Sequence, residues 1–125
     1  MKKREPAKCV FSGDIEDLSH VLKILCDMNR LRIMCLLFEG EKCVCDIEQQ
    51  LLLSQPLVSH HLGVLREAGF VSVRRKGTWS YYSLVRERID ELNHLFDRIL
   101  GRERFPENYP SREECLEVEG GTIGT

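Results

Sequence analysis

Residues 43–83 constrain the fold more than any other part of the chain. At their centre, Val58, Leu62 and Leu65 recur at positions i, i+4 and i+7, which is the spacing of a buried helical stripe. The residues off this stripe are one glycine and several hydrogen-bonding side chains: Gln55, Ser59, His60, Gly63 and Arg66. A helix with an apolar back and such a front suits the major groove of DNA, where base edges offer donors and acceptors. We therefore expect a DNA-recognition helix over residues 54–68.

The segments on either side of this helix predict a winged helix-turn-helix. Residues 46–52 indicate a second short helix that ends just before Ser54, a good N-cap for the recognition helix, and Pro56 fits the first turn. Gly69 suits the position after the last turn. Two β-rich runs then flank a glycine turn at Gly77 and predict a hairpin. The fold class expected is mainly α-helical with a small β-hairpin.

At these residues the sequence resembles a known family. The run SQPLVSHHLGVLREAGFVSVRRKGTWSYYSL resembles the ArsR/SmtB family of prokaryotic metal-sensing repressors, and the preceding GEKCVCDI is similar to its Cys-Val-Cys-Asp metalloid motif. The resemblance covers roughly residues 14–100. It implies a repressor that dimerises through its first and last helices and leaves its operator when a soft metal or metalloid binds.

Bulk properties exclude several classes of protein. The 125 residues suffice for one domain with a core, and 42% hydrophobic with 30% charged residues is ordinary for a soluble protein. No apolar run reaches the length of a membrane span, and no signal peptide follows the basic start, so we expect a cytoplasmic protein without membrane contact. The six cysteines are then expected to be free thiols. No catalytic motif is present, so the chain is not expected to be an enzyme.

The charge distribution favours DNA binding although the net charge is −2. Residues 1–13 carry four basic residues against one glutamate, and residues 54–83 carry four against one. A local positive surface is enough to hold phosphates, and it doubles in a dimer. The residues expected to bind DNA are Gln55, Ser59 and His60 for base edges, Arg74, Arg75 and Lys76 for phosphates, Arg66 on the front of the recognition helix, and His61 as either a phosphate contact or a structural residue. The partner expected is double-stranded DNA with an inverted-repeat operator, bound by a homodimer.

The predicted organisation is a flexible basic arm (residues 1–13), a winged domain (residues 14–100) and an acidic, disordered tail (residues 101–125). Asn29 is the expected N-cap of the second helix, and Cys26 and Cys35 are expected to pack as small apolar residues. The last helix carries an apolar stripe that nothing later in the sequence covers: Val85, Ile89, Leu92, Phe96 and Ile99. Such a stripe favours dimerisation.

Cys43 and Cys45 mark the start of the third helix. Cys43 can cap this helix with Asp46 at the N3 position, or Asp46 can be the cap with Gln49 completing a capping box. Either arrangement places the sulfurs at the positive end of the helix dipole, where the thiol pKa is expected to fall. Thiolates bind soft ions such as As(III), Sb(III), Cd(II), Pb(II) and Zn(II). Binding would distort the helix that supports the recognition helix.

The identity of a third ligand stays open. Family members that bind As(III) in this helix carry a third cysteine where this chain has Glu48, so a third thiolate would come from Cys9, which we prefer, or from Cys115. We expect arsenite or antimonite as the inducer and no constitutive cofactor. The alternatives are Cd, Pb or Zn, or thiol oxidation and reactive sulfur, sensed by the same cysteines; a further alternative is a winged helix used only for protein contact. Asp90, His94 and Asp97 share a face of the last helix, which we expect to be solvated.

Overall fold

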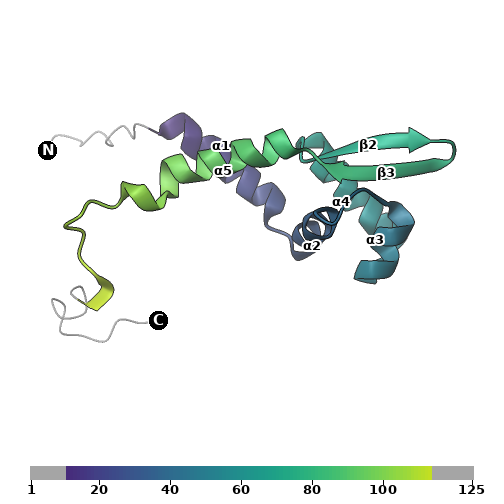
Figure 1. Ribbon diagram of the computed structural model, residues 1–125, viewed down its shortest axis with the longest axis horizontal. Coiled ribbons are helices and arrows are strands. Elements are labelled where there is room, and N and C mark those ends of the chain that lie inside the picture. Colours follow the sequence, from purple (N-terminus) through teal and green to yellow (C-terminus); the bar gives the residue numbers. More distant parts are fainter. Residues whose placement is uncertain (1–10, 114–125) are drawn as a thin grey trace, which may run out of the picture.

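The computed structural model describes residues 11–113, so Cys9, Cys115, most of the predicted arm and half of the predicted tail lie outside the described residues. The elements in chain order are α1 (Ser12–Leu25), α2 (Met28–Leu37), β1 (Lys42–Cys43), α3 (Val44–Leu51), α4 (Gln55–Glu67), β2 (Val71–Lys76), β3 (Trp79–Leu84), α5 (Arg86–Leu100) and the 3₁₀ turn η1 (Arg102–Arg104). Helices α1 and α5 lie side by side at one end, and α2, α3 and α4 gather with the hairpin at the other (Figure 1). The predicted winged helix-turn-helix is confirmed.

The predicted stripe of the recognition helix forms the centre of the core. Val58, Leu62 and Leu65 are all 0% exposed, and they belong to one cluster with Ile33 of α2 and Ile47 of α3. Burying an aliphatic side chain contributes about 1.5–3 kcal/mol. The apolar back of α4 therefore fixes which of its residues can face outward.

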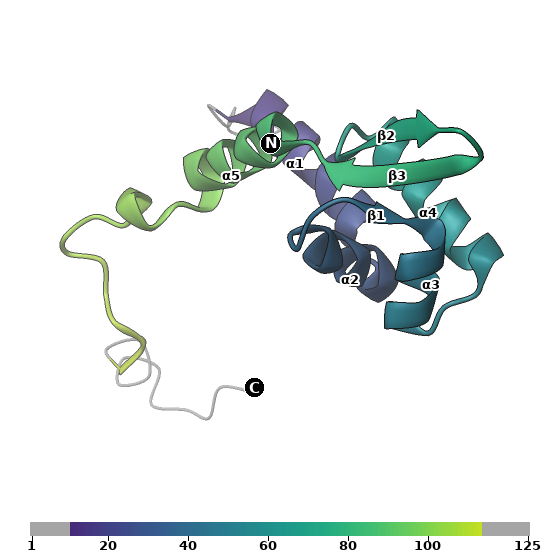
Figure 2. The same ribbon diagram turned by 45° about the vertical axis from the view of Figure 1, so that its right-hand side comes forward.

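A third strand that the sequence did not indicate joins the hairpin. The sheet order is β1-β3-β2, all antiparallel, and Cys43 of β1 pairs with Tyr81 of β3. Figure 2 shows β1 running beside β3 before the chain enters α3. The hairpin closes through Gly77 and Thr78, with Gly77 at φ 61, a conformation that glycine adopts without strain. The cysteine motif is thus attached directly to the wing.

Two helix starts differ from the expectation. Asp27, not Asn29, caps α2: its Oδ1 accepts hydrogen bonds from the backbone N–H of Asn29 at 2.8 Å and of Arg30 at 3.1 Å. The N–H of Arg30 is the main reason why the pKa of the Asp27 carboxyl is lowered. Asp27 takes this role because its extended backbone directly precedes the first helical residue. Helix α1 begins at Ser12, two residues before residue 14, where the winged domain was expected to start.

Helices α1 and α5 share a second, smaller core. Leu18, Leu95 and Ile99 are buried together, and Leu92 packs against both this cluster and the main one. Arg98 also donates to both carboxylate oxygens of Asp14, at 3.0 and 3.2 Å. The expectation that the whole α5 stripe is left exposed is therefore wrong for Leu92 and Ile99, which contribute to the core of their own chain.

The segment after α5 makes local contacts as far as Tyr109. Arg104 donates to the backbone oxygen of Ile99, and its guanidinium lies 4.9 Å from the ring centroid of Phe11. Phe105 and Tyr109 stack edge to face. Residues 114–125 lie outside the described residues, so a disordered tail there stays a prediction.

Candidate DNA-binding surface and cysteine site

The front of α4 is exposed and polar, as expected. Gln55, Ser59 and His60 are exposed, and the Gln55 side-chain amide donates to the Ser59 hydroxyl at 2.8 Å, which holds the two side chains in register. A Cβ added at Gly63 would meet nothing within 4 Å, so packing inside the protein gives no reason for glycine there. Arg66 is also exposed. This face leaves room for the close approach of a nucleic-acid backbone.

His61 does not belong to this face. It is 4% exposed, its Nδ1 accepts a hydrogen bond from Arg30 Nε at 3.1 Å, and its Nε2 lies 3.8 Å from Asp27 Oδ1. Burial lowers the pKa of His61. Consecutive helical residues point about 100° apart, so an outward His60 turns His61 toward α2. The structural alternative therefore holds, and the assignment of His61 as a DNA contact is wrong.

The wing presents its basic residues unequally. Arg74, Arg75 and Lys76 are all exposed on β2. Arg74, however, makes a bidentate ion pair with Glu41, at 2.7 and 3.2 Å. Among residues 11–113 no ion pair involves Arg75 or Lys76, so these two side chains are immediately available to phosphates.

The cysteine motif adopts the first of the two capping arrangements considered above. Cys43 is the N-cap of α3, with extended backbone, and its N–H donates to Asp46 Oδ2 at 3.3 Å. Cys43 is 8% exposed whereas Cys45 is exposed. The same residue therefore ends a strand, caps a helix and offers a sulfur.

The pKa of Cys43 is raised, opposite to the expectation from the helix dipole. Burial is the main cause, and the nearby Asp46 carboxylate and Cys45 act in the same direction. The backbone N–H of Asp46 opposes them without prevailing. A thiol shielded from water loses more from desolvation than it gains from the helix start.

Both cysteines line one cavity of about 260 Å³ that reaches the wing and the recognition helix. Its lining residues are Cys43, Val44, Cys45, Glu48, Gln55, Thr78, Trp79 and Ser80. The soft donor set fits an ion such as As(III) through two sulfurs, but residues 11–113 contain no group of three or more metal-ligating side chains. Sequence patterns missed Trp79 as a neighbour of the cysteines, because only the pairing of β1 with β3 brings the wing to α3. They also missed Gln55, which reaches the cavity from the start of α4.

The remaining candidate ligands are exposed. Cys26 and Cys35 are exposed, so the expectation that they pack in the core is wrong. Cys26 is the C-cap that follows α1, and the buried residues of this helix are Leu18, Val21 and Leu25. Asp90, His94 and Asp97 are also exposed, in agreement with a solvated face.

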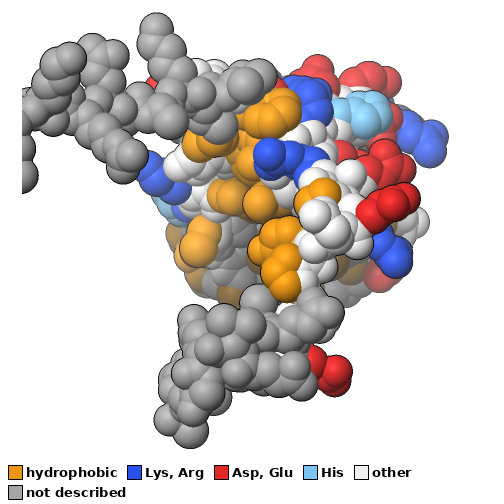
Figure 3. Space-filling view, turned by 90° about the vertical axis from the view of Figure 1, so that its left-hand side faces the viewer, with side chains coloured by type: hydrophobic (Ala, Val, Ile, Leu, Met, Phe, Trp, Pro, Cys, Tyr) orange, Lys and Arg blue, Asp and Glu red, His pale blue; other side chains and the backbone are white. Residues whose placement is uncertain are grey.

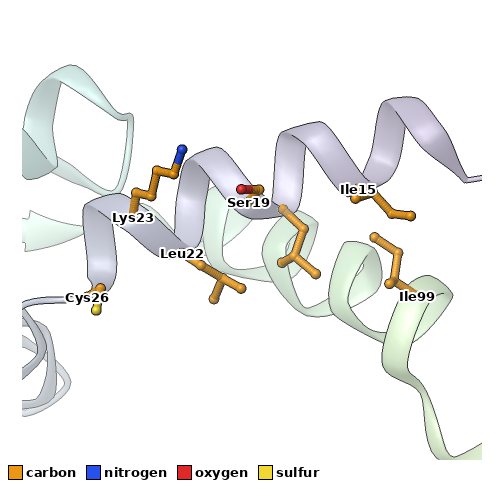
Figure 4. A pocket seen from close by; sticks show the side chains of 7 residues that line it. Ile15, Ser19, Leu22, Lys23, Cys26 and Ile99 are labelled. Carbon is orange, nitrogen blue, oxygen red and sulfur yellow. The ribbon is translucent and has the colours of Figure 1, made fainter.

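A second surface feature is an apolar groove between α1 and α5. The groove has a volume of about 380 Å³ and is lined by Ile15, Leu18, Ser19, Leu22, Lys23, Cys26 and Ile99. Figure 4 shows Ile15 and Leu22 of α1 projecting on the side of Ile99 of α5. On this end of the molecule, hydrophobic side chains gather between charged ones (Figure 3). Ile15 is 42% and Leu22 is 43% exposed, so within one chain the face is only partly covered.

The exposed polar helix, the tight turn before it and the basic hairpin after it together define a winged helix-turn-helix DNA-binding protein. Residues 27–73 match the family described as "Bacterial regulatory protein, arsR family". The chain belongs to this ArsR family of DNA-binding transcriptional regulators, which are not enzymes. None of the helices in residues 11–113 has the length and apolar character needed to cross a membrane.

Named relatives agree with this assignment. An uncharacterised HTH-type transcriptional regulator of Methanocaldococcus jannaschii is 41% identical over 85 residues, which span 67% of this chain and 96% of the relative. The arsenical resistance operon repressor of Staphylococcus xylosus is 39% identical over 84 residues, 67% of this chain and 81% of the relative. The solution structure of a homodimeric winged helix-turn-helix domain from Mycobacterium bovis matches with a TM-score of 0.57 at 25% identity, covering 87% of this chain and 100% of that one. Membership of this family, together with the similarity to named repressors, identifies the chain as a transcriptional repressor.

Proposed function

We propose that this protein is a homodimeric repressor that leaves an inverted-repeat operator when arsenite or antimonite binds Cys43 and Cys45. One observation carries the proposal: the cavity lined by both cysteines is also lined by Gln55 of the recognition helix and by Trp79 of the wing. The inducer site and the DNA-binding surface therefore share residues.

DNA binding would use the exposed front of α4 and the wing. Gln55, Ser59 and His60, which are exposed on this front, would read base edges in the major groove, where each base pair presents its own donors and acceptors. Arg66, Arg75 and Lys76 hold phosphates, whereas Glu41 holds Arg74, which would add a further phosphate contact only when this ion pair is removed.

A two-fold dimer would form through α1 and α5. The groove at Ile15 and Leu22 is an apolar surface on the outer helices, and such surfaces mark interfaces. A two-fold dimer presents two recognition helices, which suits half-sites about 10 bp apart or a multiple of that. The homodimeric M. bovis domain supports this assembly.

The coupling between the two sites follows from the position of Cys43. To hold one ion, Cys43, the last residue of β1 and N-cap of α3, and Cys45, in the first turn of α3, must direct their sulfurs to the same atom. The first turn of α3 must then bend. Cys43 also pairs with Tyr81 of the wing, and α3 is joined to α4 by a tight turn in which Leu52 has φ 55. Any bend at Cys43 therefore displaces both DNA-contacting elements.

A three-thiolate site would take its third sulfur from Cys9, which we prefer, or from Cys115. Cd(II), Pb(II) or Zn(II) at the same cysteines is the alternative class of inducer, since thiolates accept all of these ions. Sensing of oxidants is disfavoured by Cys43, because oxidation-sensitive thiols are accessible and of low pKa, whereas Cys43 is buried with a raised pKa.

The test is titration of the reduced protein on its operator, selected from a random duplex library, with As(III), Cd(II), Zn(II) and peroxide. As(III) should release the wild type. The Cys43→Ser and Cys45→Ser variants should bind the operator and stay bound. Cys26→Ser and Cys35→Ser are matched controls, because both thiols are exposed and outside the cavity, and they should respond normally. Release of the Cys43/Cys45 double variant by As(III) would contradict the proposal.

A further inference from the structure

The side chain of Arg30, on α2, bonds two other helices through one guanidinium group. Its Nε donates to His61 Nδ1 of the recognition helix at 3.1 Å, and its Nη1 donates to the backbone oxygen of Ile24, in the last turn of α1, at 2.9 Å. The backbone N–H of Arg30 donates in turn to the Asp27 carboxylate at 3.1 Å. A guanidinium presents its donors in a rigid planar fork, so it fixes the separation of its two acceptors. Arg30 therefore links α4 to the end of α1.

His61 can take part in this link only in its neutral form. A ring nitrogen that accepts a hydrogen bond carries no proton, so Nδ1 is unprotonated while Arg30 donates to it. Within residues 11–113, His61 is the one polar or charged residue that is buried. A proton on Nδ1 would remove the acceptor and place a buried imidazolium against the guanidinium. The link would then open.

The groups around His61 favour the neutral ring. Burial acts most strongly in this direction and lowers the pKa of His61, and the charges of Arg30 and His60 add to the effect. The Asp27 carboxylate opposes them without prevailing. Elements α3 and β2 also pack on α4, and their residues in the core are the apolar Ile47 and Val71.

We propose that Arg30 and His61 position the recognition helix relative to α1, and that a proton taken up by His61 opens this link and weakens operator binding. The inference rests on the proposed function, because it assumes that α4 reads the operator in a dimer that forms through α1 and α5. In such a dimer the orientation of α4 on α1 sets the separation of the two recognition helices. That separation has to match the spacing of the two half-sites.

The direction of the pH effect distinguishes this link from general electrostatics. His60 is exposed on the front of α4, so its protonation adds positive charge toward the phosphates and should strengthen DNA binding in acid. Protonation of His61 should weaken it. Operator binding favours neutral His61, so affinity is complete above the pKa of this residue and is lost as the pH falls through that lowered value, below about 6.5.

The first experiment measures operator affinity by fluorescence anisotropy between about pH 7.5 and 5.0, a range that brackets the reference pKa of histidine. Circular dichroism at each pH confirms that the protein is folded. Wild-type affinity should fall in acid, approaching about tenfold per pH unit for one linked proton. His61→Gln offers an amide oxygen to Arg30 and takes up no proton, so this fall should disappear. His20→Gln combined with His94→Gln removes exposed histidines of α1 and α5 and should keep the wild-type profile.

The second experiment tests the positioning role at neutral pH. Operators are compared whose half-sites are moved one base pair closer together or further apart. Arg30→Lys keeps the charge but loses the fork, so the preference for the natural spacing should fall by about 5-fold or more, the lower end of typical coupling between linked elements. Arg32→Lys is the matched control, since Arg32 lies on the same helix and donates to Asn29 and Leu51 instead. A role in stability alone would weaken binding to all spacings equally.

Three results would overturn the inference: wild-type affinity that is flat or rises in acid, a His61→Gln variant that keeps the fall, or an unchanged spacing preference in Arg30→Lys. Each of them leaves release by As(III) through Cys43 and Cys45 untouched. Failure of the wild type to bind any operator at pH 7.5 would instead contradict the proposed function.

Discussion

Arg74 on the wing donates to both carboxylate oxygens of Glu41, which directly precedes the strand that carries Cys43. The hydrogen bonds from Arg74 are the main reason why the pKa of the Glu41 carboxyl is lowered, so the pair is charged at neutral pH. The guanidinium also lies 5.0 Å from the ring centroid of Tyr81, the strand partner of Cys43. Arg74 of the wing is thus bound to Glu41, in the segment that leads into the cysteine site.

Removing the charge of Glu41 should strengthen DNA binding. Glu41→Gln frees Arg74 for a phosphate, which adds one charge contact and steepens the slope of log affinity against log salt by about one unit. Anisotropy titrations over a series of salt concentrations measure both quantities. Glu91→Gln is the control, since Glu91 pairs with Arg88 of α5, away from the wing. An unchanged slope in Glu41→Gln would show that Arg74 does not contact DNA.

Substitution of Arg75 and substitution of Gln55 should impair DNA binding in different ways. Arg75→Ala removes an exposed phosphate contact. Binding to all sequences should therefore weaken, and the slope of log affinity against log salt should become shallower by about one unit. Gln55→Ala removes a base contact and should cost roughly 1–3 kcal/mol of discrimination between the operator and altered sites. Competition with specific and random duplexes separates the two. Equal losses on both kinds of DNA for both variants would contradict this division of roles.

The apolar groove predicts the oligomeric state. Ile15→Asp combined with Leu22→Asp places two charges on residues that are half exposed in one chain, so the product should be a folded monomer with weak operator binding. Sedimentation and circular dichroism measure assembly and folding. Phe38→Asp is the control, because Phe38 is exposed at the end of α2 and outside the groove. Leu92 is unsuitable for this test, since it packs in both cores.

Buried His61 predicts a loss of stability in mild acid. Its pKa is lowered in the folded state, so the unfolded chain binds this proton more readily. The stabilising effect is complete above the unfolded pKa of about 6.5 and is lost as pH falls through that value toward the lowered one. Urea unfolding of His61→Phe should show a flatter dependence of stability on pH between about pH 7.5 and 5.5, the range around the reference pKa of histidine. His60→Gln, at an exposed position, should keep the wild-type dependence.

Cadmium and arsenite should differ in their response to pH. Cd(II) must displace the proton of Cys43, and burial raises the pKa of this thiol. Below that pKa, the displacement of this one proton should make the apparent affinity for Cd(II) rise about tenfold per pH unit. Neutral arsenite trades hydroxyls for thiols with release of water, so its equilibrium should be nearly flat. Competition titrations measure both. A flat cadmium curve across neutral pH would contradict the protonated state of Cys43.

Local patterns were enough for the recognition helix and the hairpin. The stripe of Val58, Leu62 and Leu65 and the glycine turn at Gly77 depend on spacing and on backbone preferences that neighbouring residues set. Ser54 and Pro56 also mark the start of α4 correctly. These features need no knowledge of how distant segments meet.

Features that depend on distant contacts were missed or misjudged. Strand β1 is two residues long and exists only because β3 is beside it, and this pairing also brings Trp79 to the cysteines. His61 was misplaced because the rotation of a helix about its axis is set by its packing partners. The raised pKa of Cys43 has the same origin, since its burial comes from the assembled sheet and core.

Trp79 is the single tryptophan of the chain, and it stands in the wall of the cysteine cavity on the strand that leads away from the wing tip. Indole emission responds to polarity and to nearby heavy atoms. Occupation of the cavity and docking of the wing on DNA would each alter the spectrum of the same fluorophore. The molecule therefore carries an internal optical reporter, and the order of ligand arrival and operator departure can be timed in stopped flow on unlabelled protein.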